Sequence, residues 1–189
     1  MKKIILASGS PRRKQLLEWA EIPFEVMVAN TGESYPENLS TEEAALHIAT
    51  NKALAVQSKA FTNGEDCTII AADTIVTLEN KIIGKPTDRE DAIKILSDLS
   101  GKTHQVITGV CILSSSKKII FAEKTEVEFH ELTHAQIEYY IDKYKPYDKA
   151  GAYAIQEWIG VIGVKSIKGD FYNVIGLPVS RVVLELQKF

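Results

Sequence analysis

Strand and helix patterns alternate along the whole chain, and this alternation limits the fold more than any other feature of the sequence. Short apolar runs at 3–7 and 67–78 are typical of buried strands, and the Ala-rich run at 41–58 is typical of an amphipathic helix. No fixed-length repeat or low-complexity linker interrupts the pattern. Because a chain of 189 residues has about the length of one domain, we expect a single α/β or α+β domain over residues 1–189.

Caps and turns predict where the other elements begin and end. Ser10 before Pro11 predicts a helix start, and residues 40–43 and Thr87 with Glu90 have the form of capping boxes. Polar residues at 79–81 and 114–118 predict the turns of two hairpins. The remaining predicted elements are strands at 24–29, 105–113, 119–129 and 161–167, and helices at 134–143 and after Pro178, the last with Val182, Val183 and Leu186 on its inner side.

Charge and composition exclude several classes of protein. Lys and Arg number 22 against 25 Asp and Glu, and the net charge of -3 gives no long-range attraction for a nucleic-acid polymer. No apolar run approaches transmembrane length, and the stretch after Met1-Lys2-Lys3 is too short for a signal peptide. Cys67 and Cys111 are too few for a disulfide framework. We therefore expect a cytoplasmic protein that binds neither nucleic-acid polymers nor membranes.

The segment from Ser8 to Lys14 joins the first predicted strand to the first predicted helix. It places three consecutive cations, beginning with Arg12 and Arg13, in the first helical turn. The unpaired N–H groups of a helix start already carry roughly half a positive charge, so cations there are unfavourable unless an anion binds. Small residues let the backbone approach a phosphate, and arginine can hold one with two parallel hydrogen bonds. The pattern favours an anion site over a solvated helix start, although it is not a Walker loop.

Asp73 interrupts the apolar run at 67–78. An ionised carboxylate on a buried strand is costly unless it meets a cation, a metal or hydrogen-bond donors, and a strand-end Asx turn is the structural alternative. Lys52 in the Ala-rich helix and Lys85 after Gly84 would each, taken alone, be ordinary surface residues. Together with Asp73 and the arginine pair they form a candidate site for a triphosphate and a metal, because phosphoryl chemistry needs charge neutralisation and a positioned water.

Residues 130–134, His-Glu-Leu-Thr-His, match the HExxH pattern of zinc peptidases. That chemistry requires both histidines on one helical face. The preceding residues 126–129 alternate as a strand, and Thr133 with Gln136 has the form of a helix cap. The two histidines would then stand on either side of a helix start, so we expect this match to be accidental.

Several longer motifs resemble those of the Maf family of nucleoside triphosphate pyrophosphatases, in the same order along nearly the full length. They are LASGSPRR at 6–13, ADT at 72–74, GKP at 84–86, LSG at 99–101 with His104, TGV at 108–110, DKAGAYAIQ at 148–156 and NVIGLP at 173–178. The resemblance implies an α/β fold with a mixed, twisted sheet and flanking helices in two lobes around a cleft, similar to inosine triphosphate pyrophosphatases. It also implies hydrolysis between the α and β phosphates of a nucleotide with a divalent cation, Mg²⁺ or Mn²⁺, present.

The resemblance also assigns residues. The catalytic carboxylate falls on Asp73, and the phosphate-handling positions fall on Ser8, Arg12, Arg13, Lys52 and Lys85. Glu33 corresponds to an acidic metal position shared with Asp73, and here Gly32 precedes it where the family commonly has Asp. The positions for substrate choice fall on Arg12, Thr74 and Gln156. Residues 153–156 are similar to the branch that acts on dTTP and UTP, although Glu157 follows where the family often has Gly.

Other functions stay open at this point. A nucleotide-binding regulator without turnover would keep the same site, and the family has a historical link to septum formation. A related pyrophosphatase could instead act on modified nucleotides such as 7-methyl-GTP, in a role that sanitises the nucleotide pool. The zinc peptidase would need the HExxH segment to be helical. The expected partner is the nucleotide substrate, with a homodimer left open.

Overall fold

The structure, a computed structural model, describes residues 3–60 and 67–189. Met1 and Lys2, which we considered above as part of a signal peptide, lie outside the described residues. Within these two ranges, no helix combines the length and the apolar character that spanning a membrane requires.

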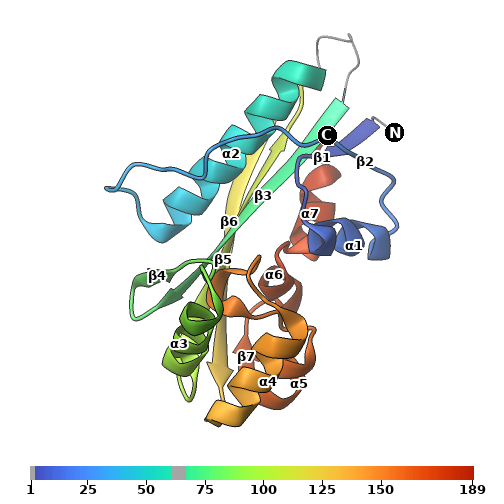
Figure 1. Cartoon of the computed structure of the whole chain (residues 1–189). Coiled ribbons are helices and arrows are strands. Elements are labelled where there is room, and N and C mark those ends of the chain that lie inside the picture. Colours follow the sequence, from blue (N-terminus) through green and yellow to red (C-terminus); the bar gives the residue numbers. More distant parts are fainter. Residues whose placement is uncertain (1–2, 61–66) are drawn as a thin grey trace. The chain divides into compact units, whose positions relative to one another are not determined.

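Within residues 3–60 and 67–189, seven strands form one mixed sheet (Figure 1). They are β1 (Lys3–Leu6), β2 (Glu25–Val26), β3 (Cys67–Leu78), β4 (Lys81–Ile83), β5 (Thr103–Leu113), β6 (Lys118–Phe129) and β7 (Val164–Lys168). The strand order is β2-β1-β3-β5-β6-β7, with β4 paired to β3. β1 runs parallel to β2 and β3, whereas β3–β4 and β6–β7 are antiparallel. The predicted mixed α/β architecture with flanking helices is confirmed.

The helices are α1 (Pro11–Trp19), α2 (Thr41–Ala60), α3 (Arg89–Leu99), α4 (His134–Tyr144), α5 (Trp158–Gly163), α6 (Phe171–Ile175) and α7 (Val179–Leu186), with a 3-10 turn at Ala150–Ala152. The chain divides into two compact units. Unit 1 comprises Met1–Thr74, Thr108–Glu123 and Gly176–Phe189, and unit 2 comprises Ile75–Ile107 and Lys124–Ile175. Two units agree with the expected two lobes, and the cleft stays a prediction.

In unit 1, α2 packs its alanine-rich face against the sheet (Figure 1). A Cβ on Gly109 of β5 would lie 2.4 Å from the backbone carbon of Ala45, so only glycine lets the helix approach this closely. Both cysteines are buried in this core, and neither is part of a disulfide. Its buried members are Ile5, Ala7, Ala49, Ala53, Val56, Ala60, Cys67, Ile69, Ala71, Cys111 and Leu113.

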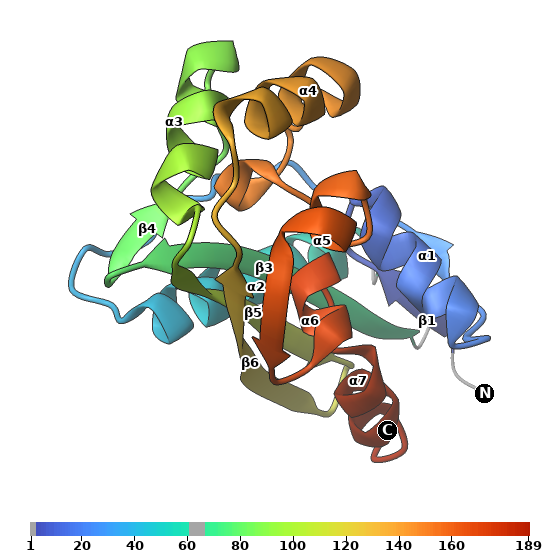
Figure 2. The same cartoon turned by 90° about the horizontal axis from the view of Figure 1, so that it is seen from below.

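In unit 2, α3 and α4 lie side by side (Figure 2). Arg89 at the start of α3 donates to Asp142 and Glu138 of α4. In the same unit, the rings of His104, Phe129 and Tyr153 meet edge to face with centroids 5.0–5.4 Å apart. These contacts fasten the segment after the 3-10 turn to β5 and β6.

Several local predictions are confirmed. The strand at 67–78 has the predicted limits, and α2 begins with the predicted capping box, in which Ser40 Oγ accepts from Glu43 N–H and Glu43 accepts from Ser40 N–H. The hairpin turns at 79–80 and 114–117 also stand where expected. In the final helix, Val182 is fully buried and Val183 and Leu186 are half-buried.

Three predictions need correction. Asp88, not Thr87, caps α3, because the Asp88 carboxylate accepts from Asp91 N–H while Thr87 N–H donates to the Asp91 side chain. The strand predicted at 161–167 starts only at Val164, and its first residues belong to α5. The predicted strand at 24–29 shortens to Glu25–Val26, since β2 is an exposed edge pairing only with β1.

Candidate functional site

Asp73 lies on β3 and forms an ion pair with Lys52. Its side chain is 12% exposed, and the Lys52 ammonium donates to Asp73 Oδ1 at 2.6 Å. The same ammonium donates to Glu33 Oε1 at 3.2 Å. The cost of placing a carboxylate on a buried strand is therefore offset by an ion pair, as the sequence required. The Asx-turn alternative for Asp73 is wrong, because β3 continues to Leu78.

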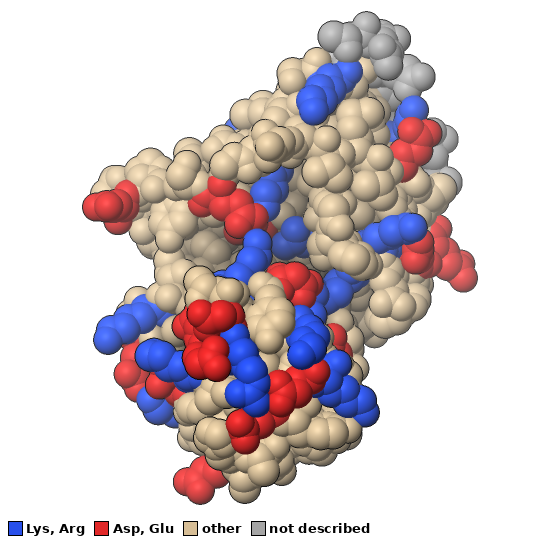
Figure 3. All heavy atoms as spheres, in the orientation of Figure 1, with Lys and Arg blue, Asp and Glu red and all other residues tan. Residues whose placement is uncertain are grey.

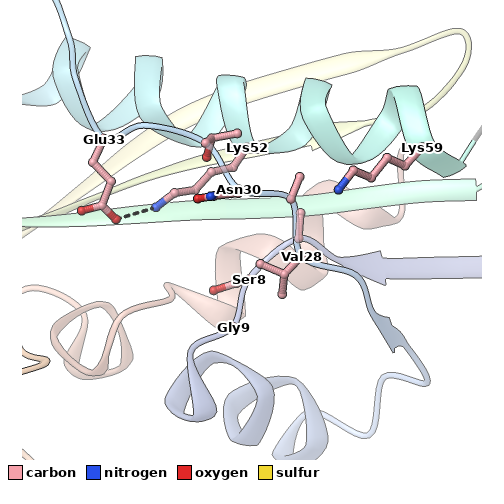
Figure 4. A pocket seen from close by; sticks show the side chains of 10 residues that line it. Ser8, Gly9, Val28, Asn30, Glu33, Lys52 and Lys59 are labelled. Atoms are coloured by element: carbon pink, nitrogen blue, oxygen red, sulfur yellow. Dashed lines mark hydrogen bonds and ion pairs between the residues drawn. The ribbon is translucent and has the colours of Figure 1, made fainter.

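A pocket of about 590 Å³ opens beside this ion pair in unit 1 (Figure 4). It is lined by Ala7, Ser8, Gly9, Val28, Ala29, Asn30, Thr31, Glu33, Lys52 and Lys59. The parallel strands β1 and β3 explain its position, because the residues after Leu6 and Ile70 lie at the same end of this strand pair. In Figure 4, the Lys52 side chain extends from α2 towards Glu33, while Ser8 and Gly9 lie on the segment between β1 and α1. The volume suits a small-molecule ligand.

Arg13 has a different environment from the one expected of a phosphate ligand. It is 9% exposed, and its guanidinium donates to Ser8 Oγ at 3.1 Å, Thr74 Oγ1 at 3.0 Å and Gly176 O at 2.8 Å. The Thr74 hydroxyl also contacts Thr108 Oγ1 at 2.9 Å. Burial lowers the pKa of the Arg13 guanidinium, and the charge of Asp73 opposes that shift. Arg13 thus ties together the segment after β1, strand β3 and the segment before α7.

Arg12 is the other cation of the predicted anion site. Its side chain is half-buried in the first turn of α1, directly after Pro11. Ser10 is the N-cap residue but its hydroxyl makes no capping hydrogen bond. The roles of Arg12 and Arg13 as phosphate ligands stay predictions.

The donor set fits a hard divalent cation that also takes ligands from a substrate. Two carboxylates, Glu33 and Asp73, converge on one ammonium, and Mg²⁺ is usually held by one or two carboxylates plus substrate phosphates. In the part of the chain that the structure describes, no group of three or more His, Cys, Asp or Glu residues could hold a metal by itself. The chain's own oxygens therefore suit a shared cation rather than an all-protein cage.

Comparison with known proteins assigns the chain to a family. The family model described as Maf-like protein matches residues 3–189. The chain belongs to the Maf family. A protein of Parabacteroides distasonis named dTTP/UTP pyrophosphatase is 50% identical over 188 residues, covering 99% of this chain and 96% of that protein. A protein of Phocaeicola vulgatus with the same name is 52% identical, covering 98% and 95%.

Among solved structures, the Staphylococcus aureus Ham1 protein matches with a TM-score of 0.43 and 16% identity. This match covers 68% of the present chain and 72% of the Ham1 chain.

The Maf motifs predicted to form the site divide between the two units. Unit 1 contains Ser8, Arg12, Arg13, Glu33, Lys52, Asp73 and Thr74. Arg13 donates to Ser8 and Thr74, and Lys52 donates to Glu33 and Asp73. The charges of Asp73 and Arg13 also interact. Lys85 and Gln156 belong to unit 2, and both are exposed. Within that unit, Gly151 N–H donates to Gly84 O, so the Gly-Lys-Pro motif and the segment leading to Gln156 are neighbours. Their roles in the Maf site stay predictions.

The HExxH segment is broken as expected. β6 ends at Phe129, residues 130–133 are irregular, and α4 begins at His134. Thr133 caps α4 in a complete capping box with Gln136. The two histidines therefore do not share a helical face, and the helical arrangement that a zinc peptidase needs is excluded.

Sequence reasoning missed three polar residues that line the pocket, Asn30, Thr31 and Lys59. Lys59 follows Lys52 by seven residues, which is close to two helical turns and places both on one face of α2. This spacing could have indicated that Lys59 lies on the same side of the helix as Lys52. Asn30 lies in an irregular segment, where the sequence carries no periodic signal.

Proposed function

We propose that this chain hydrolyses dTTP and UTP to the monophosphate and pyrophosphate, as an enzyme of nucleotide metabolism. The observation that carries the proposal is the Asp73–Lys52–Glu33 cluster beside a pocket of nucleotide-binding size, in a chain about half identical to proteins named dTTP/UTP pyrophosphatase. Near-complete coverage of both chains supports carrying over the activity as well as the fold.

The proposed chemistry distributes its tasks among the residues of unit 1. Asp73 acts on the attacking water, and Lys52 orients this carboxylate through a hydrogen bond to Oδ1 at 2.6 Å. Ser8 and Arg12 bind phosphate oxygens near the start of α1. A divalent cation held by Asp73 and Glu33 would neutralise phosphate charge and acidify the water. Arg13 acts mainly by orienting Ser8 and Thr74, since its bonds go to protein atoms.

Unit 2 contributes the proposed base and phosphate contacts. Lys85 would add positive charge for the triphosphate, and Gln156 would meet the base. Uracil and thymine present an acceptor at O4 beside a donor at N3, which one amide can answer with a donor and an acceptor. Cytosine presents a donor at N4 and an acceptor at N3, which is the reverse arrangement. Purines are excluded because they are too large for the same position. A polar group left facing the wrong edge costs ~1–3 kcal/mol, so a preference of about tenfold or more over CTP is expected.

Surface charge supports a free nucleotide, not a polymer, as the substrate. On the face of unit 2 shown in Figure 3, acidic and basic side chains alternate and no broad basic patch stands out. Together with the net charge of -3, this favours substrate capture by local groups. We also propose a cytoplasmic location, because two cysteines are too few for the disulfide framework of a secreted protein.

A pyrophosphate-release assay tests the proposal. kcat/KM is measured for dTTP, UTP, CTP, GTP and 7-methyl-GTP with Mg²⁺ present, and dTTP and UTP should rank first. Best activity on CTP or 7-methyl-GTP would contradict the base assignment while leaving the reaction type intact. Nucleotide binding without pyrophosphate release would favour the regulator instead.

A further inference from the structure

The turn that carries Gln156 exposes this one side chain and buries its neighbours. Tyr153, Ala154 and Ile155 are 6%, 5% and 5% exposed, whereas Gln156 is exposed. The turn closes through a hydrogen bond from Glu157 N–H to Ala154 O at 3.0 Å. A held backbone fixes the point from which the Gln156 amide reaches a base, whereas a mobile turn would let the side chain adjust its reach to other bases.

Tyr140 of α4 holds this turn at two points. Its side chain is fully buried, and its hydroxyl accepts from Ala154 N–H at 3.1 Å and donates to Glu157 Oε2. The Tyr140 hydroxyl therefore connects the backbone of Ala154, near the start of the turn, to the side chain of Glu157 at its end. Removing it would leave a buried N–H group without this acceptor.

Lys149 supports the other carboxylate oxygen of Glu157. The Lys149 ammonium lies 3.8 Å from Glu157 Oε1, and its side chain is only 10% exposed. It also donates to Asp148 at 2.7 Å. Glu157 is thus bound from two directions, although its own side chain is 24% exposed.

The backbone of α5 presses on the turn from a third direction. A Cβ on Gly160 would lie 1.8 Å from Ile155 O, so the helix and the turn meet backbone to backbone. On the opposite end, His104 Nε2 and Tyr153 OH are 2.7 Å apart. The turn is held by β5, α4 and α5 together, and the Tyr140–Glu157 contact joins its two ends.

We propose that Tyr140 and Glu157 are positioning residues for base selection, which hold the backbone at Gln156 in one place so that its amide meets the edge of uracil or thymine. This role rests on the proposed function. Neither residue needs to touch the nucleotide. Glu157, which stands where the family often has Gly, is here one of the groups that hold the turn carrying Gln156.

The test compares Tyr140→Phe and Glu157→Gln with two matched controls. Tyr139→Phe removes a hydroxyl from the neighbouring, exposed tyrosine, and Glu128→Gln neutralises a carboxylate paired with Lys165 on β6 and β7. kcat and KM are measured for dTTP, UTP and CTP with each protein. Loss of one hydrogen bond in Tyr140→Phe should lower the preference for dTTP over CTP by about twofold to tenfold, through a higher KM for dTTP.

Glu157→Gln keeps an acceptor for Tyr140 but loses the charge that faces Lys149, so its preference should fall in the same direction by a smaller factor. Both controls should keep the parent's preference. Equal loss of activity on all three nucleotides, or an unchanged preference in both variants, would overturn the positioning role. A parent enzyme that releases no pyrophosphate, or prefers another base, would instead refute the proposed function, and the inference would fall with it.

Hydrogen exchange gives a readout that does not depend on turnover. The Ala154 amide should exchange faster in Tyr140→Phe than in the parent, with no change in Tyr139→Phe. Unchanged protection of residues 153–157 in Tyr140→Phe would show that the hydroxyl does not hold the turn.

Discussion

At the scale of single residues, the clearest prediction concerns the effect of replacing Asp73 on pyrophosphate release. Asp73→Asn keeps the size of the side chain but removes its negative charge, so pyrophosphate release should fall by about a hundredfold or more. The matched control is Asp98→Asn, which neutralises an exposed carboxylate paired with Lys94 at 2.8 Å. Turnover near the parent's in Asp73→Asn, with unfolding free energy unchanged, would show that another group activates the water.

His104 gives a pH prediction at the same scale. This imidazole is 1% exposed, and burial lowers its pKa from 6.5 to about 4. In the unfolded chain the imidazole is protonated below about pH 6.5, whereas in the folded chain it is protonated only below about pH 4. The contribution of His104 to the free energy of unfolding is therefore complete above pH 6.5. It decreases by about 3 kcal/mol in total as the pH falls from 6.5 to about 4.

The measurement is urea unfolding of the parent and of His104→Gln between pH 7 and pH 4. The carboxylates are common to both proteins, so the difference in slope isolates the imidazole. Gln can still reach the Tyr153 hydroxyl, whose pKa burial raises and which therefore stays protonated throughout. Parallel curves for the two proteins would contradict a buried, neutral His104.

At the scale of elements, the approach of α2 to β5 decides where Lys52 stands. Gly109→Ala would place a methyl group 2.4–2.6 Å from the backbone at Ala45 and Leu46, and neither backbone can give way without moving the helix. We expect a loss of about 1–3 kcal/mol in unfolding free energy together with reduced kcat. Gly84→Ala, where nothing lies within 4 Å of the added Cβ, is the control. Equal stability of both variants in urea unfolding would refute the close packing.

At the scale of the whole molecule, metal content separates the proposed enzyme from a zinc protein. Protein purified without added metal should contain far less than one zinc per chain by elemental analysis. A chelator should stop pyrophosphate release, and Mg²⁺ or Mn²⁺ should restore it. Stoichiometric zinc that disappears in His134→Ala would show that the HExxH segment binds metal despite the helix start between its histidines.

Local physics made several features predictable from the chain alone. The strand at 67–78, the capping box at Ser40 and the helix start after Thr133 depend on neighbours within a few residues, so the sequence contains all the partners involved. Asp73 could be singled out for the same reason, because a carboxylate within an apolar run demands compensation wherever the run is buried.

Tertiary structure decided which partners these residues meet. Lys52 and Asp73 are 21 positions apart, and Arg13 reaches Gly176 across 163 positions, so no periodicity could pair them or show that Arg13 binds protein atoms. Residues 161–163 look like a strand by composition, yet they lie in α5, which packs on the turn before it through Gly160. The sequence by itself determined most of the elements and the need for a compensating partner beside Asp73. Packing between distant segments determined that this partner is Lys52, because burial and hydrogen-bond geometry arise only when the elements assemble.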